Sequence, residues 1–294
     1  MQRKYVNIPE WHEKGYLGQG LSVFCDDVGG SHVAIVADII QTILPKARVY
    51  TGGISYVQKN NAIASCTVNC RETNELLPFD EFVVKYDIGL INNSTDGGYA
   101  DRILPIAEYM KDKIKKYNLI FCGAAGNGGA LTQKYYGACI VVASCRLVNG
   151  KIQWSYMSTG EGIDFTMFNG FVPGTSFSSP FLLGMAGLLR CKYPGITQPE
   201  VYEYFKTHAQ DILEPGKDEK SGWGLPIMGD PKTVIKMQIG NHKITVDGKP
   251  IILDQAPVYN ERGDRTLVPL RAIAEAFGAT VDWDEATKTV TIVR

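Results

Sequence analysis

The feature that most constrains this 294-residue chain is the alternation of apolar strand-like runs with helical stretches between Gly20 and about Leu213. The first run, Leu21–Cys25, is followed by a helical pattern over Ser31–Ile43, with Ser31 as the expected N-cap. Strands that alternate with helices build a parallel sheet covered on both faces. We therefore predict an α/β domain of three layers, with a mostly parallel sheet and its chemistry at strand ends and helix starts. Further expected elements are strands at Arg48–Tyr50, Tyr86–Asn92, Asn118–Cys122 and Ala138–Ala143, and a helix at Ala100–Tyr117.

Glycine and proline gather at Gly222–Pro226 and Gly229–Pro231, which is typical of a domain boundary. Beyond them, Asp247-Gly248 between two apolar runs is a hairpin signal, and Leu270–Phe277 is a helical pattern before a second predicted hairpin. We predict a main domain over residues 1–231 and a small α+β module over residues 236–294.

Composition excludes several classes of protein. The 30 Lys and Arg residues nearly balance the 31 Asp and Glu residues, so a nucleic-acid partner is not expected. The longest apolar stretches, such as Phe181–Leu189, fall short of the roughly 20 residues of a membrane span. The first 20 residues lack the apolar core of a secretory signal, so we expect a cytoplasmic protein as synthesised. The alternative is an extracellular one, released by lysis or through a removed leader.

The seven cysteines are odd in number and scattered through apolar segments, which favours reduced, buried thiols. Cys66 and Cys70 have the spacing of a metal pair, but no second Cys or His pair lies at ligand spacing. We predict neither a metal site nor a cofactor.

The sharpest motif is Gly174–Pro180, which opens an apolar helix. A serine in the first helical turn, such as Ser176, lies near free backbone N–H groups and the positive end of the helix dipole, which suit an anionic tetrahedral intermediate. Pro180 is expected in that same turn, where its missing N–H costs nothing. The alternative is that Thr175 or Ser176 is simply an N-cap.

Two further segments hold groups that such a serine needs. Gly123–Gly129 ends a buried strand in small residues and places the amide of Asn127 among them, either as an oxyanion donor or as a turn residue. His32 follows Asp27 by five residues, which span at most about 17 Å, so a strand-end carboxylate and a helix-start imidazole can meet.

The order Asp27, His32, Asn127 and Ser176 resembles the subtilisin family of serine peptidases over roughly residues 16–228. The resemblance extends to Gly18–Gly29, Ser31–Ala37, Ile91–Ser94, Ala124–Asn127, Trp154–Gly160, Gly174–Pro180 and Gly222–Gly224. It implies that Ser176 is the nucleophile, His32 the base, Asp27 rather than Asp26 the orienting carboxylate, and Asn127 an oxyanion donor. It also implies that Ser94, Ala125 and Gly126 bind substrate.

An alternative register and two short segments qualify the resemblance. An alternative register aligns His32 with the second, non-catalytic histidine of the family motif and leaves Gly29 at the catalytic position, which implies an inactive enzyme. The segments between Asp27 and His32 and between Asn127 and Ser176 are short for the family, which implies no calcium site and an open cleft. Tyr5–Pro9 is a candidate short blocking extension.

The tail from about Lys236 resembles the copper amine oxidase-like N-terminal domain of bacterial surface proteins, most clearly at Gly263–Arg271 and Val281–Asp284. It holds one histidine and no cysteine, so we expect no metal there. Attachment to a cell surface or protein ligand is the predicted role, and a passive stabilising appendage is the alternative.

Together these patterns predict a bacterial or phage serine endopeptidase that acts on protein or peptide substrates. Two alternatives stay open: a pseudopeptidase that binds peptides without cleaving them, and a tethering protein whose function lies in the tail.

Overall fold

The computed structural model describes residues 1–27, 29–60, 62–95, 103–131, 133, 135–155, 158–170, 172–231, 234–246, 249–262, 264–277 and 279–293. It divides into two compact units, Met1–Asp230 and Pro231–Arg294.

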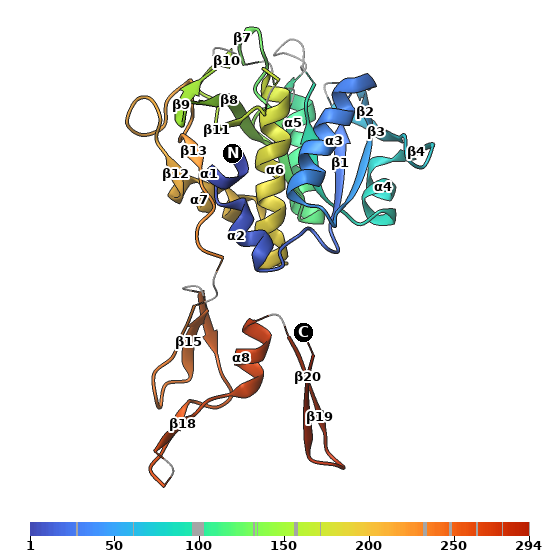
Figure 1. Ribbon diagram of the computed structural model, residues 1–294. Coiled ribbons are helices and arrows are strands. Elements are labelled where there is room, and N and C mark those ends of the chain that lie inside the picture. Colours follow the sequence, from blue (N-terminus) through green and yellow to red (C-terminus); the bar gives the residue numbers. More distant parts are fainter. Residues whose placement is uncertain are drawn as a thin grey trace. The chain divides into compact units, whose positions relative to one another are not determined.

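The first unit is built on a nine-stranded sheet (Figure 1) with the order β11-β8-β6-β5-β1-β2-β3-β4, and β9 pairs with β8. The central strands from β11 to β2 are parallel, whereas β3, β4 and β9 add antiparallel pairs. The predicted α/β class with a mostly parallel sheet is therefore confirmed. The strands are β1 (Ser22–Asp26), β2 (Arg48–Lys59), β3 (Ala62–Cys70), β4 (Glu75–Pro78), β5 (Ile88–Asn93), β6 (Ile120–Ala124), β8 (Ile140–Val148), β9 (Lys151–Trp154) and β11 (Phe165–Phe168).

Helices cover both faces of the sheet, each over its own apolar cluster. Alternate side chains of one strand serve the two clusters: Val23 and Cys25 lie in the first, and Phe24 lies in the second. The first cluster includes side chains of α2 (Ile8–Glu13), α3 (Gly30–Ile43), α6 (Thr175–Lys192) and α7 (Gln198–Thr207). The second includes side chains of α4 (Phe79–Lys85) and α5 (Ile103–Tyr117). Short elements complete the unit: α1 (Gln2–Tyr5), β7 (Gly129–Ala130), β10 (Ser158–Thr159), β12 (Ala209–Gln210) and β13 (Leu225–Pro226).

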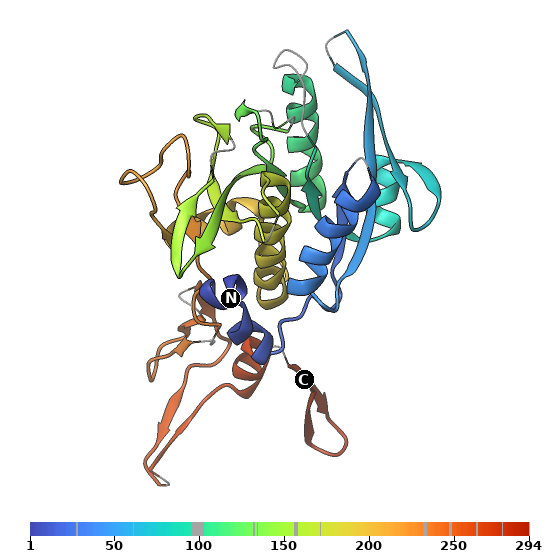
Figure 2. The same cartoon turned by 45° about the horizontal axis from the view of Figure 1, so that its top comes forward.

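The strand expected at Arg48–Tyr50 is much longer than the sequence suggests. β2 continues to Lys59 and turns back as β3, and the hairpin projects beyond the end of the sheet (Figure 2). Only Arg48–Gly52 of β2 pairs with β1. The rest of the hairpin therefore stands next to the carboxyl end of β1.

The N-terminal segment is part of the first cluster and not a detachable extension. Val6, Ile8 and Trp11 are fully buried, and the indole N–H of Trp11 donates to the carbonyl of Gly229 at 2.8 Å. The blocking role considered for Tyr5–Pro9 does not fit this packing, because removing the segment would uncover the core.

The predicted reduced cysteines are confirmed: all seven are free thiols, and only Cys191 is partly exposed. No helix among the described residues is long and apolar enough to cross a membrane.

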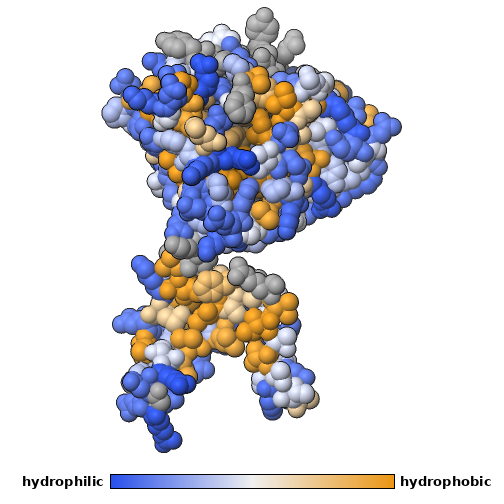
Figure 3. Space-filling model, viewed as in Figure 1, coloured by the Kyte–Doolittle hydropathy of each residue, from blue (hydrophilic) through white to orange (hydrophobic). Residues whose placement is uncertain are grey.

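The second unit consists of three small antiparallel sheets and one helix, with little buried apolar surface of its own. Ile244, Leu253 and Val281 are buried among its described residues, and Figure 3 shows an apolar face on it. A groove of about 780 Å³ is lined mainly by apolar residues from two segments, 251–258 and 267–276, the second of which contains α8. The elements are β14 (Ile235–Lys236), β15 (Lys243–Val246), β16 (Lys249–Ile252), β17 (Val258–Asn260), β18 (Arg265–Leu267), α8 (Leu270–Ala276), β19 (Thr280–Asp284) and β20 (Thr289–Val293).

Candidate active site

The predicted site residues gather at one edge of the sheet. Asp27, Ser94 and Asn127 follow the carboxyl ends of β1, β5 and β6, while His32 and Ser176 lie in the first turns of α3 and α6. The carboxyl ends of parallel strands meet at the same edge, so topology alone brings these five side chains to one region.

Asp27 and His32 are joined directly. The Nδ1 atom of His32 lies 2.7 Å from Oδ2 of Asp27, and the carboxylate side chain is fully buried whereas 37% of the imidazole side chain is exposed. The five-residue link closes because Gly29 and Gly30 adopt φ values of 114° and 68°, which side chains disfavour. Gly29 is also the N-cap of α3, so the expectation that Ser31 caps this helix is wrong.

The first turn of α6 explains why Ser176 depends on Ser94. The N-cap is Gly174, so neither Thr175 nor Ser176 serves as one, and Pro180 lies in the second turn rather than the first. Because proline has no N–H, it cannot donate to the carbonyl four residues earlier, which belongs to Ser176. The hydroxyl of Ser94 donates to that carbonyl instead, at 2.8 Å.

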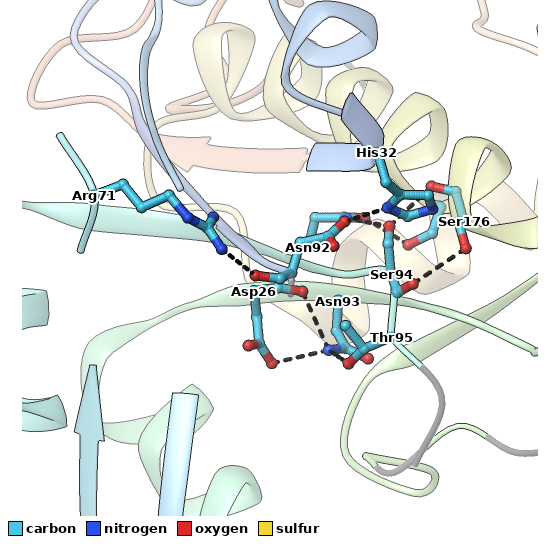
Figure 4. A network of polar contacts seen from close by, with 10 residues as sticks. Asp26, His32, Arg71, Asn92, Asn93, Ser94, Thr95 and Ser176 are labelled. Carbon is cyan, nitrogen blue, oxygen red and sulfur yellow. Dashed lines mark hydrogen bonds and ion pairs between the residues drawn. The ribbon is translucent and has the colours of Figure 1, made fainter. Parts of the chain in front are cut away.

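The Ser176 hydroxyl has its own hydrogen bond to the same neighbour. Its Oγ donates to the backbone carbonyl of Ser94 at 3.1 Å. Figure 4 shows the imidazole of His32 beside Ser176, and the ring of His32 also packs on Phe177 with centroids 5.2 Å apart. The Ser176 hydroxyl is therefore bonded to the carbonyl of Ser94 and lies next to the imidazole of His32.

Asn127 is oriented by the residue before Ser176. Its Oδ1 accepts hydrogen bonds from the backbone N–H of Thr175 at 3.0 Å and from the Thr175 hydroxyl at 3.2 Å. A backbone N–H can only donate, so the partner atom must be the amide oxygen. The Nδ2 group of this exposed side chain is left to donate elsewhere.

Ala125 and Gly126 are buried, and their backbone groups are largely engaged. The N–H of Ala125 donates to Val142, while the N–H and carbonyl of Gly126 both bond to the hydroxyl of Thr175. These residues can line a wall of the site, and only the N–H of Gly126 is fully used, because its carbonyl can accept a second hydrogen bond.

Sequence reasoning assigned no role to two residues that hold Ser94. The Nδ2 of Asn92 donates to Oγ of Ser94 at 2.7 Å, and the hydroxyl of Ser179 donates to Oδ1 of Asn92 at 2.7 Å. Asn92 lies in the Ile91–Ser94 motif and Ser179 in the Gly174–Pro180 motif. A polar residue in an apolar strand and a hydroxyl in an apolar helix are the sequence features that point to them.

Asp26, which the sequence analysis places outside the triad, organises hydrogen bonds on the opposite side of β1. Its carboxylate accepts from the N–H of Ile54, from Nδ2 of Asn93 and from the hydroxyl of Tyr135, at 2.8–2.9 Å. Figure 4 shows it directed toward Asn93 and away from His32. Burial and then the charge of Asp26 raise the pKa of Tyr135, so that phenol stays protonated and remains a donor.

The cysteines on the strands that lead to the site are not suited to nucleophilic chemistry. Burial raises the pKa of Cys25 and of Cys122 far above the usual thiol range, so both stay in the unreactive thiol form.

The second unit does not fit a copper site. Its one histidine, His242, contacts the carbonyl of Leu253 through Nδ1. Among the described residues of the chain, no three His, Cys, Asp or Glu side chains converge as a metal-binding group. Copper prefers imidazole or sulfur ligands, and this unit lacks such a set.

Comparisons with known proteins identify one family over the C-terminal part of the chain. Residues 227–292 match the family model of the copper amine oxidase N-terminal domain. The Neisserial autotransporter lipoprotein NalP of Neisseria meningitidis serogroup B is 46% identical over 54 residues, which is 18% of this chain and 5% of that protein.

Three solved structures share the fold. Fervidolysin from Fervidobacterium pennivorans, a keratinolytic enzyme related to subtilisin, has a TM-score of 0.54 and 15% identity over 77% of this chain and 44% of its own. MycP1 from Mycobacterium smegmatis has a TM-score of 0.54 and 16% identity over 78% and 82% of the two chains. A lanthipeptide protease has a TM-score of 0.51 and 16% identity over 70% and 85%. These likenesses establish the fold, so the predicted subtilisin-like architecture is confirmed.

Proposed function

We propose that the first unit is a serine endopeptidase that cleaves peptide bonds through an acyl-enzyme. The observation that carries this proposal is the 2.7 Å contact between the buried Asp27 and the half-exposed His32, with Ser176 beside that imidazole at the start of α6. The same contact favours the register in which His32 is the base.

The chemistry uses the groups in sequence. Ser176 Oγ exchanges its bond to Ser94 for one to Nε2 of His32, gives its proton to that nitrogen and bonds to the peptide carbonyl carbon. Asp27 stabilises the imidazolium and fixes its tautomer. The imidazolium then protonates the leaving amine, and water attacks the acyl-enzyme with His32 again as base.

The developing oxyanion has two donors. One is the backbone N–H of Ser176, which has no partner within the helix because it lies in the first turn. The other is the Nδ2 of Asn127, whose orientation is set by Thr175. Replacing Asn127 by Ala should lower kcat by about 10²–10³, the range found for such a donor in subtilisin.

Covalent labelling tests the proposal. A fluorophosphonate probe should label the folded protein and should not label Ser176→Ala. Ser31→Ala is the matched control, because this exposed serine lies next to His32 and should leave labelling unchanged. His32→Ala and Asp27→Ala should each slow labelling strongly, whereas His242→Ala should not. Labelling that persists in Ser176→Ala, or its absence from folded wild type, refutes the proposal.

A second candidate is a peptide-binding pseudopeptidase, which the bond from Ser176 to Ser94 favours because it holds the hydroxyl away from the base. Tight binding of a peptide without labelling or cleavage would select it.

A further inference from the structure

Arg71 brings a positive charge to the candidate site from an element that the proposed reaction does not use. It follows β3, and its backbone N–H donates to the carbonyl of Thr51 at 2.9 Å. Its side chain reaches over β2, and Nη2 donates to the backbone carbonyl of Asp27 at 2.9 Å. Figure 4 shows it approaching from the side opposite Ser176.

The guanidinium is held in place at two points. Besides the bond to Asp27, it lies against Gly29, where a Cβ atom would stand 3.0 Å from Nη2 of Arg71. Because Gly29 has no side chain, the guanidinium of Arg71 can occupy the space next to it. A cation fixed in this way loses less entropy when it binds a ligand than a freely rotating side chain does.

No carboxylate of the described residues neutralises Arg71 in an ion pair. The carboxylate of the adjacent Glu72 accepts from the N–H and hydroxyl of Thr51, at 2.7 and 2.6 Å, and that of Asp27 is bonded to His32. A guanidinium has five N–H donors in a planar fork, and the one bond to Asp27 leaves the others available on an exposed residue. That fork matches the two oxygens of a carboxylate.

We propose that Arg71 is a specificity-determining residue, which binds an aspartate or glutamate side chain of the substrate close to the cleaved bond. The proposal rests on the peptidase function proposed above. The guanidinium bonds to Asp27, whose carboxylate is bonded to His32. It therefore lies close to the proposed base, where side chains next to the cleaved bond would pass.

The test uses pairs of internally quenched peptides. A peptide that the enzyme cleaves is remade with Glu, Gln or Lys at each of the two positions on either side of the cut. At one position, we expect kcat/KM for Glu to exceed that for Gln by about tenfold, the size of one charge-assisted bond. Raising the salt concentration should reduce the ratio, because the pair is exposed.

Arg71→Gln should bring the Glu/Gln ratio to about one by slowing cleavage of the Glu peptide more than that of the Gln peptide, and Arg71→Lys should retain part of the preference. The matched control is Arg48→Gln, an exposed arginine that pairs with Ser22 at the opposite end of β1. It should leave the ratio unchanged. Circular dichroism and thermal unfolding of each variant show whether it is folded.

The outcomes separate the two proposals. Cleavage without an acidic preference, or a preference that survives in Arg71→Gln, overturns the role of Arg71 and leaves the peptidase standing. Equal loss of activity on all peptides in Arg71→Gln assigns the residue to positioning Asp27 and overturns the specificity role. Absence of both labelling and cleavage overturns the peptidase, and the role of Arg71 falls with it.

Discussion

The bond from Ser94 to Ser176 makes a prediction about stability that does not depend on activity. Ser94→Ala removes the donor to the Ser176 carbonyl and the acceptor of the Asn92 amide, and both of these side-chain bonds are buried. Each of the two buried groups left without a partner costs about 1–3 kcal/mol, so the variant should lose about 2–6 kcal/mol of its free energy of unfolding.

A substitution at Pro180 makes it possible to measure the cost of the unpaired Ser176 carbonyl separately from that of the unpaired Asn92 amide. Pro180→Ala supplies an N–H four residues after Ser176, which can donate to the orphaned carbonyl within the helix. In that background Ser94→Ala should cost only the Asn92 term. The two substitutions should therefore show a coupling energy of about 1–3 kcal/mol, with the double variant more stable than the sum of the single effects predicts.

Urea denaturation followed by tryptophan fluorescence measures the cycle. The background carries Ser176→Ala to prevent self-cleavage and Trp283→Phe, so that the three remaining tryptophans report only on Met1–Asp230. Ser31→Ala should leave the midpoint unchanged as a control. Additivity within about 0.5 kcal/mol would refute the claim that Ser94 replaces the helical bond that Pro180 cannot make.

Three further predictions follow from buried groups of the first unit. Trp11→Ala should lower the free energy of unfolding by about 3–5 kcal/mol, because the side chain is fully buried and bonded to Gly229; a denaturation midpoint equal to wild type would contradict its place in the core. Iodoacetamide should modify only Cys191 in the folded protein and the other six thiols after unfolding, as counted by intact mass; rapid modification of a second thiol would show that the burial is wrong. Burial raises the pKa of Asp164, so its contribution to stability is full below the unfolded value of 3.8 and is lost as pH rises through the folded value. The free energy of unfolding of Asp164→Asn minus that of wild type should therefore increase as pH rises from about 3.5 to 7 in denaturation experiments, and a decrease in this difference would contradict the raised pKa.

The central strands and the site region follow from the sequence because they depend on local patterns. Apolar runs that end in small or polar residues locate the strands, and parallel topology then places Asp27, His32 and Ser176 at one edge. What the sequence could not show is which polar atoms meet. The bond between Ser179 and Asn92 joins residues 87 positions apart, and no spacing rule predicts it.

The length of β2 was missed for a different reason. Gly52 and Gly53 follow Thr51, and glycine is depleted in strands, yet β2 runs on through both residues. At Gly52 a Cβ atom would lie 1.9 Å from the carbonyl oxygen of Asn69 on β3. The glycine is there because two strands approach closely, a requirement that only the paired strand reveals.

The short connection between Asp27 and His32 and the presence of Arg71 are linked by one requirement. A partly buried backbone carbonyl needs a donor, and Asp27 lies at the point where β1 ends. With five residues from the carboxylate to the imidazole, and Gly29 already serving as the N-cap, there is little chain between strand and helix to supply that donor. It comes from Arg71 on the neighbouring hairpin. A connection this short leaves the role of donor to a cation at the edge of the candidate site, and the role proposed for Arg71 places its effect in the charge of the preferred substrate.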